Sequence, residues 1–263
     1  MELLSIEAGN GVMTITLDDE KRRNALGDQM VAELMEAIDG AERSPDTRVV
    51  VVTNRGSVFS AGANLEERLH GRPPQAGERR YELYELLRRV RNSPRVFVGR
   101  IAGHCVAGGV GLAAAMDISV AIDSATFGFS EVRLGVAPAV ISVVCLPKMR
   151  LADAQSAFLR GNRFGADEAV RIGLINEAVA AATIDQVVDM IVNDLLAGEP
   201  HALAAAKSLS ANVPAMTEEE AFAWTAQLSA TLFQSEEAKE GMAAFFEKRP
   251  ASWVATMAPR TDR

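Results

Sequence analysis

The sequence predicts an α/β fold in which a core of alternating strands and helices is followed by a helical region. Short β-branched runs, such as residues 48–53 and 96–101, each lead into a helical pattern, which favours crossover units with buried strands. From residue 152 onward the strand pattern fades and the apolar residues recur at helical spacing. We therefore expect an α/β core at residues 1–195 and a C-terminal helical region at residues 196–263.

The individual elements follow from local patterns. Two short strands flank Gly9, Asn10 and Gly11, which predicts a β-hairpin at residues 4–17. Further strands are expected at residues 48–53, 96–101, 118–122 and 126–129. Residues 66–77 carry charges, glycine, Pro73 and Pro74, and predict a loop. Helices are expected at residues 26–41, 81–91, 108–115, 152–159, 166–172, 184–196, 202–211, 218–232 and 235–248.

The composition narrows the function classes. The 263 residues include 35 acidic and 27 basic side chains, a net charge of −8, so the chain as a whole does not attract nucleic acid or an anionic membrane. The longest uncharged apolar run, residues 101–116, is shorter than the roughly 20 residues of a membrane span, and no signal peptide is expected. Cys105 and Cys145 form no CxxC motif, so we expect neither a disulfide framework nor a zinc site, and a cytoplasmic setting.

Two predicted strand ends are followed by small residues. Residues 59–65 are Phe-Ser-Ala-Gly-Ala-Asn-Leu, and residues 106–111 are Val-Ala-Gly-Gly-Val-Gly. Small residues let a ligand approach the backbone, and a helix N-terminus presents free N–H donors. Two such sites that converge on one oxygen form an oxyanion hole, although each stretch alone is also typical of a tight turn. Neither stretch matches a dinucleotide or phosphate-loop pattern.

A third site follows the predicted strand at residues 126–129. Glu131 stands among apolar neighbours, which raise the pKa of a carboxyl group and suit it to proton transfer near neutral pH. His104 could orient a water molecule, but a hydrogen-bonded structural role is favoured. For Asp117 we expect a capping or pairing role, and for the arginine-rich stretch at residues 79–80 and 88–91 a solvated helix face. Ser60 and Ser130 lack the partners of a serine hydrolase.

Together, and in this order, these segments resemble the crotonase superfamily, the enoyl-CoA hydratase/isomerase family. The resemblance covers nearly the whole chain. It rests on residues 21–26 (KRRNAL), 59–63 (FSAGA), 101–109 (IAGHCVAGG), 127–131 (FGFSE), 161–164 (GNRF) and 240–249 (EGMAAFFEKR). It implies repeated ββα units, a C-terminal helical oligomerisation region and an acyl-CoA thioester as substrate, with no cofactor beyond the CoA of that substrate.

The resemblance also implies residue roles. The backbone N–H groups of Ala63 and Gly108 match the family's oxyanion donors, and Glu131 matches one of its two catalytic glutamates. The positions that match CoA- or substrate-binding residues are Arg22, Arg23, Ala25, Ala61, Asn64, Leu65, Gly109, Phe245 and Lys248, of which Phe245 and Lys248 often reach the CoA of a neighbouring subunit. The family usually has Asp at the position of Asn64, and its second glutamate falls at Gly111, which has no side chain.

The missing glutamate leaves three functions open. The first is a hydratase with Glu131 as its chief acid/base; residues 110–112, 130–135 and 138–142 resemble a bacterial branch that hydrates 3-methylglutaconyl-CoA and related acyl-CoAs. The second is a Δ3,Δ2-enoyl-CoA isomerase, which needs one base. The third is an acyl-CoA-binding protein without turnover. The resemblance further implies a homo-oligomer, a trimer or a dimer of trimers.

Overall fold

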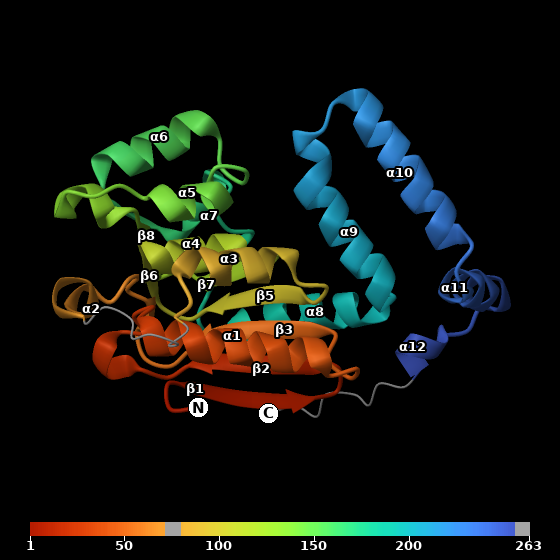
Figure 1. Ribbon diagram of the computed structural model, residues 1–263. Helices are drawn as coiled ribbons and strands as arrows, with labels where there is room; N and C mark the ends of the chain where they lie inside the picture. Colours follow the sequence, from red (N-terminus) through yellow and green to blue (C-terminus); the bar gives the residue numbers. More distant parts are fainter. Residues whose placement is uncertain (72–79, 256–263) are drawn as a thin grey trace.

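The computed structural model describes residues 1–71 and 80–255 (Figure 1). A six-stranded sheet has the order β1-β2-β3-β5-β7-β10, and a four-stranded sheet has the order β4-β6-β8-β9. The pairs β1–β2 and β8–β9 are antiparallel and the other pairs are parallel. The strands are β1 Leu4–Gly9, β2 Val12–Leu17, β3 Val49–Asn54, β4 Val58–Ser60, β5 Val96–Ile101, β6 His104–Val106, β7 Ile118–Ile122, β8 Thr126–Gly128, β9 Arg163–Gly165 and β10 Glu177–Val179.

Three successive strand pairs build the core. Strands β3, β5 and β7 enter the large sheet, and the strands that follow them, β4, β6 and β8, enter the small sheet. The helices α3 (Leu83–Asn92), α4 (Gly108–Ala115) and α5 (Ala139–Cys145) come after these pairs, so the predicted repeat of ββα units is confirmed. Because β4, β6 and β8 are parallel, their carboxyl ends lie at one edge of the small sheet. The residues that follow Ser60, Val106 and Gly128 are thereby brought together.

Helices cover both faces of the large sheet. On one face α1 (Asp28–Arg43), α3 and α4 enclose the larger core, which includes Leu34, Ile38 and Leu86. On the other face, Val188 and Val192 of α8 (Ile184–Ala197) pack against apolar residues of the large sheet. Strands that are buried on both faces read as continuous apolar runs, which explains the β-branched stretches of the sequence.

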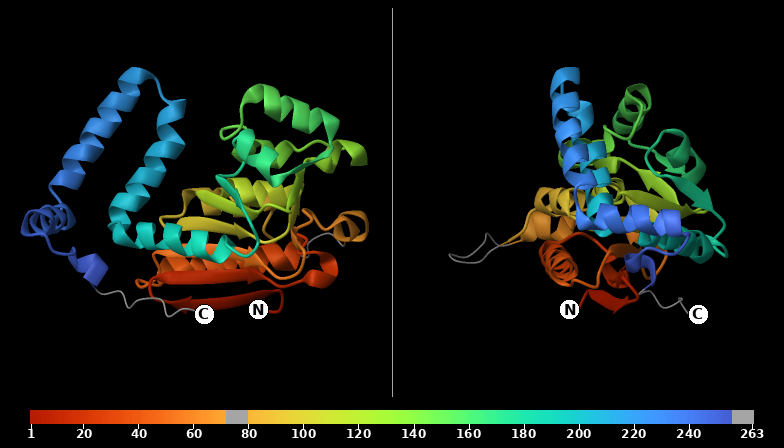
Figure 2. Two further views of the ribbon diagram at one scale, coloured as in Figure 1. Left: turned by 180° about the vertical axis from the view of Figure 1, so that it is seen from behind. Right: turned by 90° about the vertical axis from the view of Figure 1, so that its right-hand side faces the viewer.

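The C-terminal helices extend from the core on the side away from the small sheet (Figure 1, Figure 2). They are α9 (Pro200–Asn212), α10 (Glu218–Phe233), α11 (Glu236–Glu247) and α12 (Ser252–Ala255). Lys207 attaches α9 to the core, since its ammonium group lies 2.9 Å from the Asp117 carboxylate and donates to the Val90 and Arg95 carbonyls at 2.9 Å. Burial raises the pKa of Asp117 and lowers that of Lys207, and each charge opposes the shift of the other. The pairing expected for Asp117 is confirmed.

Some predictions about local structure were wrong. Strands β9 and β10 occur where helices alone were expected; each has three residues at a sheet edge, too few for a period-two pattern. The start of the expected loop at residues 66–77 belongs to helix α2 (Leu65–His70), while residues 72–77, with Pro73 and Pro74, lie outside the described residues. Helix α5 and the 3-10 helix Ser130–Leu134 were not predicted. The remaining helices are α6 (Leu151–Arg160) and α7 (Ala166–Arg171).

No helix within residues 1–71 and 80–255 is long and apolar enough to cross a membrane.

Candidate active site

The small-residue turns after β4 and β6 are in direct contact. A Cβ atom added to Gly62, whose φ is +85°, would lie 2.8 Å from the Gly108 nitrogen and 2.9 Å from the Ala107 Cβ. A Cβ on Gly108 would lie 3.5 Å from the Ala63 nitrogen. Ala107 itself has φ 50° and ψ −121°, a conformation that L-residues rarely adopt and that is typical of functional turns. The absence of a side chain at position 62 lets the Ala63 and Gly108 backbones approach each other.

The N–H groups of Ala63 and Gly108 are available to a ligand. Among the described residues, neither group donates a hydrogen bond to another atom. Gly108 begins α4, so its N–H has no acceptor within the helix and lies at the positive end of the helix dipole. Two neighbouring free donors can bind one oxygen atom and stabilise negative charge on it.

Glu131 lies on the turn after β8, beside the turn that follows β6. Its Oε2 atom is buried and, in the part of the chain that the structure describes, has no hydrogen-bond partner. Burial raises the pKa of the Glu131 carboxyl above its ordinary value, although the Glu131 backbone N–H partly opposes this shift. Phe129 anchors the turn, with its ring centroid 4.6 Å from that of Phe158. The site thus holds a half-buried carboxyl group with an unused acceptor oxygen, which suits a proton carrier.

Position 111 faces a packed helix. A Cβ on Gly111 would lie 2.3 Å from the Ile141 Cγ2 and 3.4 Å from the Leu87 Cδ1. Ile141 belongs to α5 and is 3% exposed. The same helix carries Cys145, whose pKa is raised to about 12 by burial and also by the nearby Glu131 charge. Ile141 therefore occupies the space that a side chain at position 111 would need. Ile141 could not be recognised from the sequence, because an apolar residue in a helix carries no signal of what it faces.

Residues 21–26 lie beside the turn after β4. The Ala61 N–H donates to the Arg23 carbonyl at 3.0 Å, and the Leu26 N–H donates to the Gly62 carbonyl at 2.7 Å. These bonds hold residues 23–26 beside Ala61 and Gly62. The Arg23 side chain is exposed.

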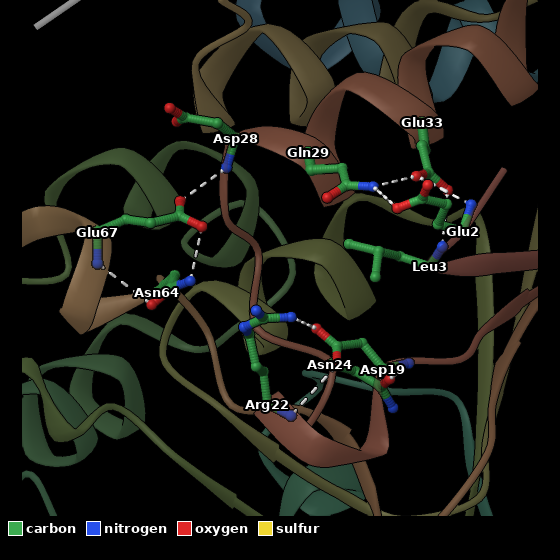
Figure 3. Close-up of polar contacts among 10 residues, drawn as sticks. All are labelled: Glu2, Leu3, Asp19, Arg22, Asn24, Asp28, Gln29, Glu33, Asn64 and Glu67. Atoms are coloured by element: carbon green, nitrogen blue, oxygen red, sulfur yellow. Dashed lines mark hydrogen bonds and ion pairs between the residues drawn. The ribbon is translucent and has the colours of Figure 1, made fainter. Parts of the chain in front are cut away.

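Asn24 holds this segment in position. The residue is fully buried, has φ 52°, and donates to the carbonyls of Arg55 and Val58 at 3.2 and 2.8 Å. Its Oδ1 accepts from the Asp19 N–H at 2.8 Å (Figure 3). The Arg22 guanidinium lies 3.4 Å from the Asp19 carboxylate. Sequence analysis assigned no role to Asn24, although asparagine tolerates a positive φ better than most residues and could have marked this turn.

Asn64 is the N-cap of α2. Its Oδ1 accepts from the N–H groups of Glu66 and Glu67 at 3.2 and 3.3 Å, and its Nδ2 donates to the Glu67 Oε1 at 2.7 Å (Figure 3). The other carboxylate oxygen of Glu67 accepts from the Asp28 N–H at 2.9 Å, at the start of α1. The Asn64 amide therefore caps α2 and holds the Glu67 carboxylate, which in turn reaches the start of α1. Leu65, the next residue, is 52% exposed.

This arrangement yields a prediction for Asn64. Asn64→Asp keeps a good N-cap but loses the donor to Glu67 and brings two carboxylates together, so we expect a loss of about 1 kcal/mol of unfolding free energy at pH 7. Urea unfolding would measure it. The matched variant Asn64→Asp/Glu67→Gln restores an amide donor and should recover the loss. Equal stability of wild type and Asn64→Asp would contradict this role.

Phe245 and Lys248 lie far from the small-sheet edge within one chain. Both belong to the end of α11, on the side of the molecule opposite α2 (Figure 1, Figure 2). Phe245 is 78% exposed. The structure does not bring these two residues to Glu131, Ala63 and Gly108 of the same chain.

His104 is held in a structural contact. Its Nδ1 accepts from the Thr126 N–H at 3.1 Å and lies 3.0 Å from the Thr126 Oγ1. This hydrogen bonding confirms the favoured prediction. Gly109 also has a packing role, because a Cβ there would lie 2.5 Å from the Ser60 carbonyl oxygen.

Comparisons with known proteins identify the family of this chain. The enoyl-CoA hydratase/isomerase family profile matches residues 7–256. A Thermus thermophilus protein named "Putative enoyl-CoA hydratase" is 34% identical over 94% of this chain and 99% of its own. The carnitinyl-CoA dehydratase of Escherichia coli K12 is 30% identical over 96% of this chain and 98% of its own length.

Solved structures of enoyl-CoA hydratases superimpose on nearly the whole chain. The enoyl-CoA hydratase/isomerase from Marinobacter aquaeolei superimposes with a TM-score of 0.88 at 27% identity, over 97% of this chain and all of the other. The enoyl-CoA hydratase of Mycobacterium smegmatis gives a TM-score of 0.85 at 28% identity, over 95% of this chain and 98% of the other. The chain thus has the crotonase fold and belongs to the enoyl-CoA hydratase/isomerase family of enzymes, within the crotonase superfamily.

Proposed function

We propose that this enzyme adds water to a 2-enoyl-CoA, with Glu131 as its acid/base and the N–H groups of Ala63 and Gly108 as its oxyanion hole. The observation that carries the proposal is the shared edge of the small sheet. There, two N–H donors and the Oε2 atom of a half-buried carboxyl group, none of which has a hydrogen-bond partner among residues 1–71 and 80–255, follow three neighbouring parallel strands.

One carboxyl group can carry the whole proton transfer. The thioester oxygen accepts hydrogen bonds from Ala63 and Gly108. As the oxygen of water bonds to the β-carbon, its proton passes to the Glu131 carboxylate and negative charge moves to the thioester oxygen. Glu131 then gives that proton to the α-carbon, which leaves the hydrated product and restores the carboxylate. Each oxyanion donor contributes about 3 kcal/mol to such a step.

The Ile141 side chain, which packs against Gly111, favours a second candidate, a Δ3,Δ2-enoyl-CoA isomerase. With no room for a second carboxylate, Glu131 would take a proton from the α-carbon of a 3-enoyl-CoA and return it to the γ-carbon. The same oxyanion hole would hold the intermediate charge. This reaction needs no bound water.

Oxygen labelling separates the two reactions. We expect a trans-2-enoyl-CoA incubated with the enzyme in heavy-oxygen water to give a 3-hydroxyacyl-CoA that carries the label, as mass spectrometry would show. Conversion of a 3-enoyl-CoA without incorporated oxygen, together with no hydration, would replace hydratase by isomerase. Turnover of neither compound class would leave acyl-CoA binding as the function.

Substrate binding and assembly are part of the same proposal. Arg22, Arg23, Ala25, Ala61, Asn64, Leu65 and Gly109 would line the CoA, with Phe245 and Lys248 supplied by a neighbouring subunit. Residues 196–263 would form the oligomerisation region of a trimer or a dimer of trimers. We propose that the enzyme works in the cytoplasm, needs no cofactor or metal beyond the CoA of its substrate, and prefers branched acyl groups related to 3-methylglutaconyl-CoA.

A further inference from the structure

The Ala63 N–H is oriented by a hydrogen bond on the far side of its own peptide group. That planar group also contains the Gly62 carbonyl, and its N–H and C=O bonds point in opposite directions. The Leu26 N–H donates to this carbonyl at 2.7 Å, and Leu26 and Ala63 form a parallel bridge. The direction of the Ala63 N–H therefore depends on where Leu26 lies.

The segment that carries Leu26 is fixed at both ends. At its start, the buried Asn24 side chain bonds to three backbone groups. At its end, α1 begins at the N-cap Gly27, which has no side chain to accept hydrogen bonds from the first N–H groups of the helix. The Glu67 carboxylate accepts one of them instead, because the Asp28 N–H donates to it at 2.9 Å (Figure 3). A side chain of α2 thus caps α1.

The surroundings of the Glu67 carboxylate suit this contact. A Cβ on Gly27 would lie 2.5 and 2.6 Å from its two oxygens, so a side chain at that position would displace it. Asn64 holds the carboxylate from the side of α2, since the Asn64 Nδ2 donates to its Oε1 at 2.7 Å. A carboxylate at a helix N-terminus is further stabilised by the positive end of the helix dipole. These contacts fix the carboxylate, although Glu67 itself is exposed.

Glu67 completes a pair of links that lie on either side of Ala63. Before Ala63, the Gly62 carbonyl is bound to Leu26. After Ala63, the Glu67 carboxylate is bound to the Asp28 N–H, two residues beyond Leu26. Without the second link the start of α1 can shift relative to α2, and the peptide group of Ala63 then shifts with Leu26. A misplacement of about 1 Å is enough to slow a reaction markedly.

We propose that Glu67 is a positioning residue, whose carboxylate holds the start of α1 and thereby orients the Ala63 N–H toward the thioester oxygen. This inference rests on the proposed function, since it takes Ala63 to be an oxyanion donor. Glu67 acts through Asp28 and Leu26 and carries no proton in the reaction.

Glu67→Ala removes both hydrogen bonds of the carboxylate. We expect the turnover number with a 2-enoyl-CoA to fall about 10- to 100-fold while KM changes by less than about threefold, because a displaced oxyanion donor weakens binding of the transition state more than binding of the substrate. Steady-state kinetics measures both values. A general loss of folded protein would be seen by circular dichroism.

A spectroscopic measurement detects the oxyanion donor without turnover. Hydrogen bonding lowers the stretching frequency of a thioester carbonyl, and infrared difference spectra of hexanoyl-CoA with and without carbon-13 at that carbonyl isolate its band. We expect the wild type to lower this frequency relative to free hexanoyl-CoA in water. Glu67→Ala should lose about half of the shift, because one of the two donors is displaced.

Glu33→Ala is the matched control. The Glu33 carboxylate likewise accepts from a side-chain amide, the Gln29 Nε2, at 2.9 Å. It also accepts from the backbone N–H groups of Glu2 and Leu3 at 3.1 and 3.0 Å, away from the Ala63 turn (Figure 3). The same change at this position removes equivalent hydrogen bonds and should leave the turnover number and the carbonyl frequency unaltered.

A second variant serves if Glu67→Ala does not fold. Glu67→Gln keeps an acceptor oxygen for the Asp28 N–H but places an amide group beside the Asn64 donor. We expect the turnover number to fall by about three- to tenfold in this variant, with KM unchanged and a smaller loss of the carbonyl shift.

Two results would overturn this inference alone. One is a carbonyl shift that the Glu67 variants retain in full, and the other is the same change of turnover number and KM in Glu67→Ala and Glu33→Ala. No carbonyl shift in the wild type would overturn the oxyanion hole, and this inference with it. A normal shift without incorporation of labelled oxygen would remove the hydratase assignment and leave the role of Glu67 standing.

Discussion

Replacing Glu131 by Gln is expected to lower the turnover number with a 2-enoyl-CoA about a thousandfold, because an amide can neither take the proton of water nor deliver it to the α-carbon. Affinity for a saturated acyl-CoA should stay within about twofold, since the N–H groups of Ala63 and Gly108 are unchanged. Steady-state kinetics and calorimetry measure the two effects. Glu36→Gln, the same change on the exposed face of α1, serves as control and should leave both values unaltered.

The same variant has an expected effect on stability. Burial raises the pKa of Glu131 above its ordinary value of 4.5, so the folded protein holds this proton more tightly than the unfolded chain. The contribution of the group to stability is then full below pH 4.5 and is lost as the pH rises through the raised pKa. Glu131→Gln should melt at a higher temperature than wild type at neutral pH, and the difference should disappear below pH 4.5. A variant less stable than wild type at pH 7 would show that Glu131 has a stabilising partner.

Activity should follow the protonation of the same group. Because Glu131 must begin as a carboxylate to accept the proton of water, the turnover number should fall as the pH drops through its raised pKa. A turnover number that stays constant down to pH 4.5 would contradict its role as base.

Gly111→Glu is expected to destabilise the fold and to gain no hydratase activity. Its Cβ would lie 2.3 Å from the Ile141 Cγ2, and its carboxylate would be forced into an apolar layer. Overpacking and an unpaired buried charge together should cost about 3 kcal/mol or more of unfolding free energy. Gly111→Ala is the matched control, because it introduces the clash without the charge. Urea unfolding of both variants separates the two contributions.

Ile141→Ala tests directly whether the Ile141 side chain is what excludes a carboxylate from position 111. It removes the closest contact and leaves the Ile141 Cβ at 2.9 Å, so a small shift of α5 should admit a side chain at position 111. In a double-mutant cycle, Gly111→Glu should cost less in the Ile141→Ala background than in the wild type. Hydration of a straight-chain 2-enoyl-CoA should rise in the double variant alone. A stable Gly111→Glu single variant with new hydratase activity would show that Ile141 does not exclude the carboxylate.

Much of the fold could be predicted from the sequence, because long periodic segments carry their own signal. The spacing of apolar residues located α1, α8 and α10, and the β-branched runs located β3 and β5. The short edge strands β9 and β10 could not be predicted, since three residues that pair through backbone atoms show no pattern. Helix α5 was missed for a related reason, because its seven residues give barely two helical turns.

The sequence by itself determined which residues are candidates for chemistry: the small residues around Ala63 and Gly108, the carboxyl group of Glu131 and the missing side chain at Gly111. The tertiary structure decided how they combine. Parallel pairing of β4, β6 and β8 brings segments far apart in the chain to one edge. Burial there leaves one oxygen of Glu131 without a hydrogen-bond partner in the described part of the chain. That Ile141 occupies the space beside Gly111 is likewise a property of packing, because what a glycine faces depends on residues distant in the sequence.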